Sequence, residues 1–179
     1  LRRPAARLRV PGGQAVTGAQ VTATAFAPAS VGNVAVGFDI LGHSVAALGD
    51  RVRVTRRTER GVAIRSITGV VADLPLAAEK NTAGMAALAL GRELGLPYGF
   101  ELDIVKGIPL GSGLGGSAAS AVAAVVAAAA VSGEALDRTR LLKFAMQGEA
   151  VASGSVHVDN IAPSLYGGLV LTVGIDNPH

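Results

Sequence analysis

Four glycines and two serines fall within the seven residues Gly111-Ser112-Gly113-Leu114-Gly115-Gly116-Ser117. Glycine loses more conformational entropy on folding than other residues, so this density predicts a backbone that takes positive φ or lets a ligand approach closely. The alanine-rich residues that follow predict a helix, whose first N–H groups lack intrahelical partners and whose dipole is positive at that end. The pattern predicts an anion site, most simply a phosphate cradle, with a purely structural turn as the alternative.

Two other stretches carry side chains that can bind a substrate or a metal ion. Asn33 and Asp39 lie in a loop that also contains glycines, and a later stretch carries Glu149, His157, Asp159 and Asn160. Taken alone, asparagine and aspartate in such a loop are turn formers. A glutamate at a helix end is ordinarily solvated, and a single histidine in a loop is more often structural or exposed.

Strands that could position these groups are predicted in the first third of the chain. β-Branched residues and alternation predict strands over 21–27, 40–48, 51–57 and 62–67. Pro28 is expected to end the first of them, and Gly61 is expected in the turn before the last.

Helices dominate the rest of the chain. Asn81 is a good N-cap for a helix over 83–94 that stops at Gly95, and Asp137 for another over 138–152. The alanine-rich helix is predicted over 117–131. Strands are predicted over 100–105 and 168–173, and residues 154–163 are expected to be irregular. The order of these elements predicts an α+β domain rather than a doubly wound sheet.

Composition excludes several classes of protein. Half of the 179 residues are hydrophobic but only 3% are aromatic, so aromatic platforms for nucleic-acid bases are lacking and no nucleic-acid partner is expected. Cysteine is absent, which excludes disulfides and thiolate metal sites and favours a reducing compartment. The formal charge is +3, but four arginines near the start account for it. Without them, twelve basic residues face thirteen acidic ones.

Residues 1–20 combine those arginines with prolines and glycines and show no apolar period, so a disordered basic leader is predicted there. This segment lacks the apolar core of a secretory signal. The longest apolar run, over 118–131, is shorter than the ~20 residues that span a bilayer. We therefore expect a soluble, cytoplasmic protein without a membrane partner, with one domain over 21–179.

Residues 109–119 are similar to the Pro-x-x-x-Gly-Leu-Gly-Ser-Ser-Ala motif of the GHMP kinases, a superfamily of small-molecule kinases. Gly116 stands where the first of the paired serines usually stands, which concentrates the metal-binding role on Ser117. The resemblance implies the GHMP kinase N-terminal fold, which is similar to the second domain of ribosomal protein S5. It also implies an ATP site made by Pro109, Gly111, Ser112, Gly113, Leu114, Gly115, Gly116, Ser117 and Ala118.

Two further motifs resemble those of homoserine kinases. They are Ala27-Pro28-Ala29-Ser30 with Asn33 and Gly37-Phe38-Asp39, and the Ser-Gly-x-x-His-x-Asp-Asn run over 153–160. The resemblance implies that Asp39 and His157 bind the amino-acid substrate and that Asn33 orients its hydroxyl group. Other GHMP kinases place an aspartate base near the position of Asn160. The resemblance implies transfer without such a base, through positioning and charge stabilisation, with Asp159 as the weaker alternative base.

The same resemblance implies the metal and adenine contacts. Magnesium takes one or two protein oxygens and completes its shell with water and phosphates, a demand that Ser117 and Glu149 would meet. Asn81 matches a position that contacts adenine in this family, and a role as an N-cap alone is the alternative.

The expected activity is ATP-dependent phosphorylation of the L-homoserine hydroxyl, a step toward threonine, with Mg²⁺. Two alternatives stay open: a GHMP kinase for another small alcohol, such as mevalonate or a sugar, and a non-catalytic module that binds nucleotide or RNA. Homoserine kinases continue with a second α+β domain, so residues 21–179 are expected to be the N-terminal ATP-binding domain, with the C-terminal domain absent from this sequence. The family often forms dimers, so a homodimer is one expected assembly.

Overall fold

The computed structural model describes residues 20–34, 36–38, 40–153 and 156–173. The strands in this part of the chain are β1 (Thr22–Val31), β2 (Leu41–Arg57), β3 (Gly61–Gly69), β4 (Gly99–Lys106) and β5 (Leu169–Leu171). The helices are α1 (Thr82–Glu93), α2 (Gly116–Ser132), α3 (Arg138–Ser153) and α4 (Val158–Tyr166), and a short 3-10 turn, η1 (Ala78–Lys80), precedes α1.

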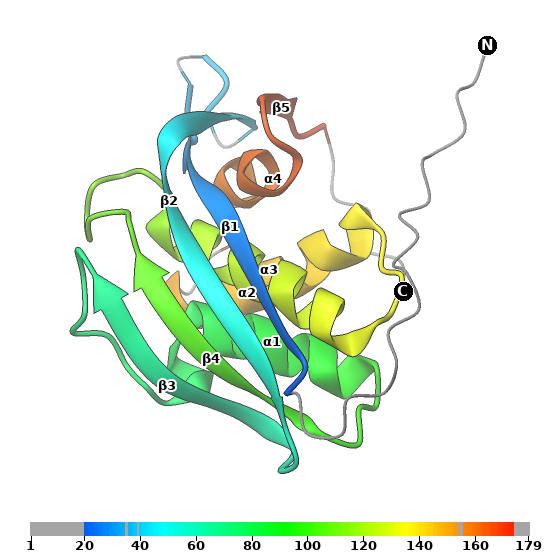
Figure 1. Ribbon diagram of the computed structural model, residues 1–179. Coiled ribbons are helices and arrows are strands. Elements are labelled where there is room, and N and C mark those ends of the chain that lie inside the picture. Colours follow the sequence, from blue (N-terminus) through cyan, green and yellow to red (C-terminus); the bar gives the residue numbers. More distant parts are fainter. Residues whose placement is uncertain (1–19, 35, 39, 154–155, 174–179) are drawn as a thin grey trace.

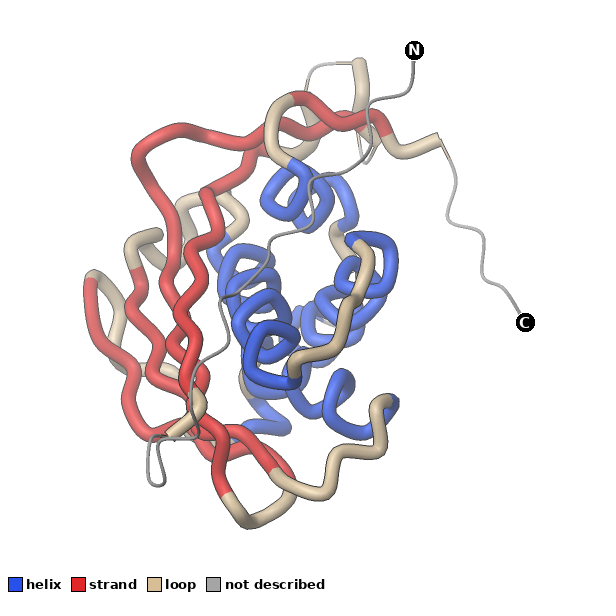
Figure 2. The backbone as a smooth tube through the Cα atoms, turned by 45° about the vertical axis from the view of Figure 1, so that its right-hand side comes forward, coloured by secondary structure: helices blue, strands red, loops and turns tan. Residues whose placement is uncertain are grey.

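The strands form one sheet in the order β1-β2-β4-β3, with β5 paired to the start of β2. The β1–β2 and β2–β4 pairs are antiparallel, whereas β3 and β4 run parallel. Figures 1 and 2 show the sheet as one layer and the helices as a second layer against one of its faces. The predicted α+β class is confirmed.

Three predictions about the strands were wrong. Pro28 does not end β1, which continues to Val31 with a register shift just after the proline. A proline is tolerated there because β1 is an edge strand, where a missing N–H leaves no central ladder bond unmade. The segments predicted as strands over 40–48 and 51–57 form one strand, β2, because the side chain of Asp50 is buried and paired rather than placed in a turn. Gly61 is the first residue of β3 and not part of the preceding turn.

The helix α2 is buried around most of its circumference. Its residues are small and apolar on all sides, which is the pattern of a helix enclosed by other elements. It packs against β1 and β2 and against α1, α3 and α4. Gly115, with φ of 63°, precedes the helix, and Gly133, with φ of 77°, ends it. The prediction of this helix over 117–131 is confirmed to within one residue at each end.

The predicted N-caps are confirmed. The Asn81 side chain accepts hydrogen bonds from the N–H groups of Ala83 and Gly84, at 3.0 and 3.4 Å. The Asp137 side chain accepts one from the N–H of Arg140 at 2.8 Å, and α3 begins directly after Asp137. Both caps satisfy N–H groups that have no partner inside their helix.

The prediction of an irregular segment over 154–163 holds for residues 156–157 but was wrong over 158–163, where α4 (Val158–Tyr166) forms and includes Pro163. A proline inside a helix cannot donate a hydrogen bond to the carbonyl four residues earlier, here that of Asp159. This carbonyl lies against Gly42 of β2 so closely that a Cβ at Gly42 would overlap it. The glycine therefore lets α4 dock on β2.

Gly42→Ala is expected to lower the free energy of unfolding by about 2 kcal/mol, because the added methyl group forces α4 away from β2. Urea denaturation would measure this change. The matched control is Gly91→Ala in α1, where a Cβ meets only Phe100, at 3.5 Å. That control removes a helix-interior glycine and is expected to raise stability by about 0.5–1 kcal/mol. Equal stability of the Gly42 variant and the wild type would contradict the proposed docking role.

Candidate functional site

The glycine loop forms one wall of a pocket of about 680 Å³. Gly111, Gly113 and Gly115 take φ angles of 69°, 71° and 63°, so the predicted positive-φ backbone is confirmed. The opposite wall combines apolar and polar residues: Val71, Leu74, Pro75, Glu79, Lys80, Asn81 and Thr82. Ile104, Lys106, Ile108 and Ser120 also contribute to its lining.

The loop leads directly into the N-terminus of α2. Because the N-cap residue, Gly115, has no side chain, no side-chain cap satisfies the first N–H groups of this helix. The positive end of the helix dipole adds to the attraction for an anion. The predicted anion cradle therefore has the backbone geometry that it requires.

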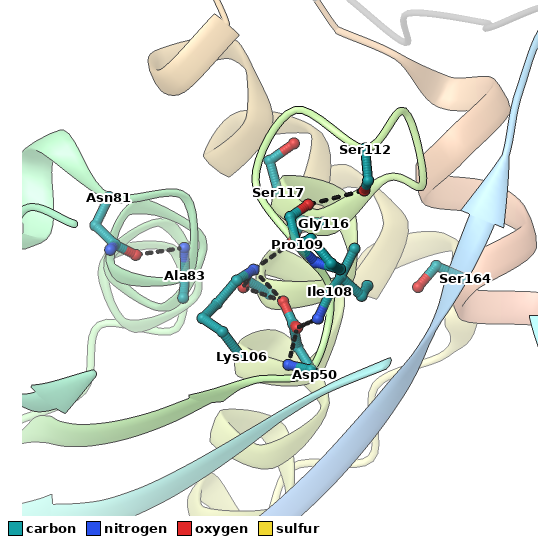
Figure 3. A network of polar contacts seen from close by, with 12 residues as sticks. Asp50, Asn81, Ala83, Lys106, Ile108, Pro109, Ser112, Gly116, Ser117 and Ser164 are labelled. Atoms are coloured by element: carbon teal, nitrogen blue, oxygen red, sulfur yellow. Dashed lines mark hydrogen bonds and ion pairs between the residues drawn. The ribbon is translucent and has the colours of Figure 1, made fainter. Parts of the chain in front are cut away.

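A buried ion pair holds both ends of this loop (Figure 3). The Lys106 ammonium pairs with the Asp50 carboxylate and donates to the Gly116 carbonyl at 2.8 Å. The other carboxylate oxygen of Asp50 accepts from the N–H groups of Gly107 and Ile108, at 2.9 and 3.3 Å. Asp50 is fully buried and Lys106 is 6% exposed. Burial of either charge alone would be unfavourable, so the pair is stable only as a unit.

Ser117 and Glu149 come together beside the pocket. The Ser117 hydroxyl donates to Glu149 Oε1 at 2.8 Å, and the Glu149 side chain is buried. Burial raises the pKa of Glu149 above its ordinary value of 4.5, although the hydrogen bond from Ser117 and the charges of His157 and Lys106 act in the opposite direction. Desolvation thus outweighs the stabilising contacts of this carboxylate.

The Ser117–Glu149 pair suits Mg²⁺. Neighbouring ligands of an octahedral magnesium ion lie about 2.9 Å apart, given metal–oxygen distances of about 2.0–2.1 Å. The observed separation of 2.8 Å between the two oxygens fits that geometry. Within the described residues, no group of three His, Cys, Asp or Glu side chains forms a richer metal site, and magnesium bound with a nucleotide needs only one or two protein ligands.

A second polar cluster lies on the other side of Gly115. The Ser30 hydroxyl donates to Asn160 Oδ1 at 3.2 Å, and the Asn33 N–H donates to Asp159 Oδ2 at 3.1 Å. A Cβ at Gly115 would overlap Ser30 and approach Asn160 Oδ1 within 2.9 Å. The first motif, the glycine loop and the third motif therefore meet at Gly115, although they are far apart in the sequence.

The structure places the predicted residues in two groups. The predicted nucleotide-binding residues line the pocket except Ala118, which is fully buried in α2. Asn33, Glu149, His157 and Asn160 lie outside the lining of this pocket. His157 is exposed at the N-cap position of α4. Asp39 lies outside the described residues.

Asn81 has a structural role in addition to any contact with a ligand. It caps α1, and its Nδ2 donates to the Pro75 carbonyl at 3.1 Å. It also lines the pocket, so an adenine contact stays a prediction.

Sequence reasoning missed Asp50 and Lys106. Both lie at inward-facing positions of their strands, two residues from Val52 and Ile104, which are buried. Opposite charges at inward positions of two neighbouring strands are a signal of a buried ion pair. Ser30 was identified only as part of a motif, and nothing local in the sequence predicts its contact with Asn160.

None of the described helices is both long and apolar enough to cross a membrane. The expectation that no helix spans a bilayer is confirmed for that part of the chain.

The candidate site thus combines a glycine loop before a buried helix with an adjacent Ser–Glu pair, on a sheet that helices cover on one face (Figure 2). Residues 81–168 match the family model of the GHMP kinases N terminal domain. A homoserine kinase from Xylella fastidiosa is 58% identical over 149 residues, which cover 83% of this chain and 46% of that protein. The chain belongs to the GHMP kinase family.

Solved structures support this assignment. The crystal structure of a homoserine kinase from Cytophaga hutchinsonii aligns with a TM-score of 0.83 and 45% identity, over 91% of this chain and 51% of that chain. A mevalonate kinase from L. major, solved with R-mevalonate, aligns with a TM-score of 0.68 at 17% identity, over 85% of this chain and 49% of that chain. The latter likeness concerns the fold alone. The chain spans about half the length of these relatives.

Glu149→Gln is expected to stabilise the metal-free chain at neutral pH, because burial raises the pKa of Glu149 and an uncharged amide avoids the desolvation of a buried carboxylate. A raised pKa means that the folded state binds the proton more tightly than the unfolded state. Stability is therefore lost as pH rises from below the ordinary carboxyl pKa through the folded pKa. Glutamine keeps the acceptor for Ser117 but carries no charge.

Thermal unfolding of both proteins across a pH series would measure this difference. The advantage of the glutamine variant should disappear at acidic pH, where Glu149 is protonated. An advantage that does not change with pH would contradict desolvation as its cause.

Proposed function

We propose that this chain forms the nucleotide-binding part of an ATP-dependent homoserine kinase. The observation that carries the proposal is the Ser117–Glu149 oxygen pair, 2.8 Å apart, at the N-terminus of α2 beside the glycine-lined pocket. The identity with homoserine kinases, 58% and 45% in the two relatives above, supports this acceptor over other alcohols.

In this proposal the pocket holds ATP. The triphosphate lies along the glycine loop, where backbone N–H groups and the α2 dipole stabilise its negative charge. The base lies toward the apolar residues Val71, Leu74 and Pro75, with Asn81 at the same wall. Gly115 and Gly116 leave the backbone accessible where the phosphates approach the helix.

Ser117 and Glu149 would hold Mg²⁺. When bound there, Mg²⁺ would supply positive charge that stabilises the phosphate groups during transfer. The protein itself contributes the position of these two oxygens, since Glu149 is fixed in α3 and Ser117 in the first turn of α2.

The acceptor alcohol would lie near the second polar cluster. Asn33 and Asn160 are proposed to orient the hydroxyl group, with Asp39 and His157 contacting the amino-acid portion. Asp159 is a poor candidate for a general base, because its side chain is buried and accepts from the Asn33 N–H and from the Asn160 side chain, at 3.1 and 3.5 Å. Transfer through a loose transition state depends mainly on positioning and charge stabilisation.

The assay that tests the proposal combines ATP binding with turnover. Calorimetry of the 179-residue chain should detect binding of ATP with Mg²⁺, and the full-length gene product should convert ATP and L-homoserine to ADP and O-phosphohomoserine. A panel with mevalonate and sugars tests the acceptor. Turnover with another alcohol but not with homoserine would reassign the substrate, and ATP binding without turnover of any alcohol would indicate a non-catalytic module.

Glu149→Ala is expected to lower kcat with homoserine by about 100-fold or more, because the ion loses a ligand that positions it. Added Mg²⁺ should not restore the rate. The matched control is Glu93→Ala in α1, since Glu93 pairs with Arg140 at 3.0 Å on the exposed surface. That variant should turn over at the wild-type rate. Near-normal turnover of the Glu149 variant at saturating Mg²⁺ would remove Glu149 from the metal site.

A further inference from the structure

The buried ion pair connects the two ends of the glycine loop. Asp50 binds the N–H groups of Gly107 and Ile108, where the loop begins, and Lys106 binds the carbonyl of Gly116, where it ends. Asp50 lies in β2 and Lys106 at the end of β4, so one electrostatic contact fixes the loop to the middle of the sheet. Figure 3 shows both side chains directed toward each other beneath the loop.

The three hydrogens of the Lys106 ammonium are all engaged within the protein. They serve Asp50 Oδ2, the Gly116 carbonyl and the Ser120 hydroxyl, the last two at 2.8 Å. An ammonium group has three donors and no acceptor, so no donor remains for a phosphate. Its charge is also balanced by Asp50. Lys106 lines the pocket, but its contacts are those of a structural support and not of a phosphate ligand.

The middle of the loop needs such a support. A Cβ at Gly111 or Gly113 would meet nothing within 4 Å among the described residues, so side-chain packing does not fix these two positions. Beyond the ion pair, the loop interior is held by the Ser112 hydroxyl, which donates to the Pro109 carbonyl, and by the Ser30 N–H, which donates to the Leu114 carbonyl. A loop with three positive-φ glycines is flexible unless its ends are held.

We infer that Asp50 and Lys106, with Ser120, are positioning residues that set the affinity of the loop for the polyphosphate of a nucleotide. This inference rests on the proposed ATP site. It separates two parts of binding: in the proposed site the base contacts Val71, Leu74 and Pro75, whereas the phosphates contact the loop that the Asp50 and Lys106 side chains hold. Disrupting the pair should therefore weaken the binding of nucleotides that carry a polyphosphate, and should leave the binding of adenosine nearly unchanged.

The experiment compares dissociation constants for ATP, ADP and adenosine in the presence of Mg²⁺. The double variant Asp50→Asn/Lys106→Gln removes both charges together, so neither is left buried alone. It should raise the dissociation constants of ATP and ADP by the same factor, about tenfold or more, because the loop N–H groups would no longer be held in position for the phosphates. Misplacement of a positioned group by ~1 Å can cost up to 10²-fold in rate, which sets the scale of the effect. Adenosine binding should change by less than about twofold.

Ser120→Ala is a milder variant that leaves the ion pair intact, and it keeps the test valid if the double variant fails to fold. It removes the hydroxyl that accepts from Lys106 and donates to Asp50, so it should raise the dissociation constants of ATP and ADP equally, by about threefold. The matched control is Arg56→Met, because Arg56 donates to the Val131 carbonyl at 2.9 Å, at the opposite end of α2. That variant should lower the melting temperature without changing any of the three affinities.

Four outcomes would overturn the inference. Unchanged ATP and ADP affinity in both the double variant and Ser120→Ala would show that the pair does not position the loop. Loss of ATP affinity with intact ADP affinity would make Lys106 a direct γ-phosphate ligand. Equal loss for adenosine would indicate general damage to the fold. Failure of the wild-type chain to bind either ATP or ADP would overturn the proposed function itself, and this inference with it.

Discussion

The position of α2 is the constraint on which the rest of the structure depends. The helix contacts β1, β2 and three other helices, so it is enclosed on most sides and its position is fixed by packing. Alanines and a buried serine allow this enclosure because larger side chains would hold the surrounding backbones apart. Since the helix is fixed, its N-terminus is fixed too, and the glycine loop presents its N–H groups from one defined place in the pocket.

Glycines also explain why three distant segments meet at that place. Gly32 lies against the Asp159 carboxylate and Gly42 against the carbonyl of the same residue, so both would overlap it if they carried a Cβ. Gly115 lies against Ser30 and Asn160 in the same way. These contacts bring α4 and the loop after β1 up to the first turn of α2. The polar cluster and the glycine loop thus share one boundary, where, in the proposed function, a nucleotide and an acceptor alcohol would approach each other.

Local signals in the sequence predicted much of this arrangement. The capping residues Asn81 and Asp137 and the alanine-rich segment defined three helices, because caps and composition act over a few residues. The helix α4 was missed although Val158, Ile161, Ala162 and Leu165 recur at helical spacing. Pro163 is a local signal against a helix, and the close approach of Gly42 to the Asp159 carbonyl shows how the proline is accommodated.

The contacts within the candidate site could not be predicted in the same way. Ser30 and Asn160 are separated by 130 positions, and Asn33 and Asp159 by 126, so no local rule connects them. The family resemblance placed these residues in one site without giving their contacts. By contrast, the Asp50–Lys106 pair had a local signal, since both residues follow the inward alternation of their strands. An ionisable residue at an inward strand position predicts a residue of opposite charge on the neighbouring strand, because buried charges are usually paired.

The distribution of charge around the pocket indicates why a metal ion would be part of binding. The charge of Lys106 is balanced by the Asp50 carboxylate. The other basic side chain among the pocket-lining residues is Lys80, which is exposed at η1. The polar cluster beside Gly115 contains the buried carboxylate of Asp159, and the first turn of α2 contacts the buried carboxylate of Glu149, whose pKa is raised by desolvation. A nucleotide without a cation would bring further negative charge toward that carboxylate. In the proposed function, a divalent ion between them would stabilise both, so the desolvation of Glu149 would favour binding of the nucleotide together with its metal.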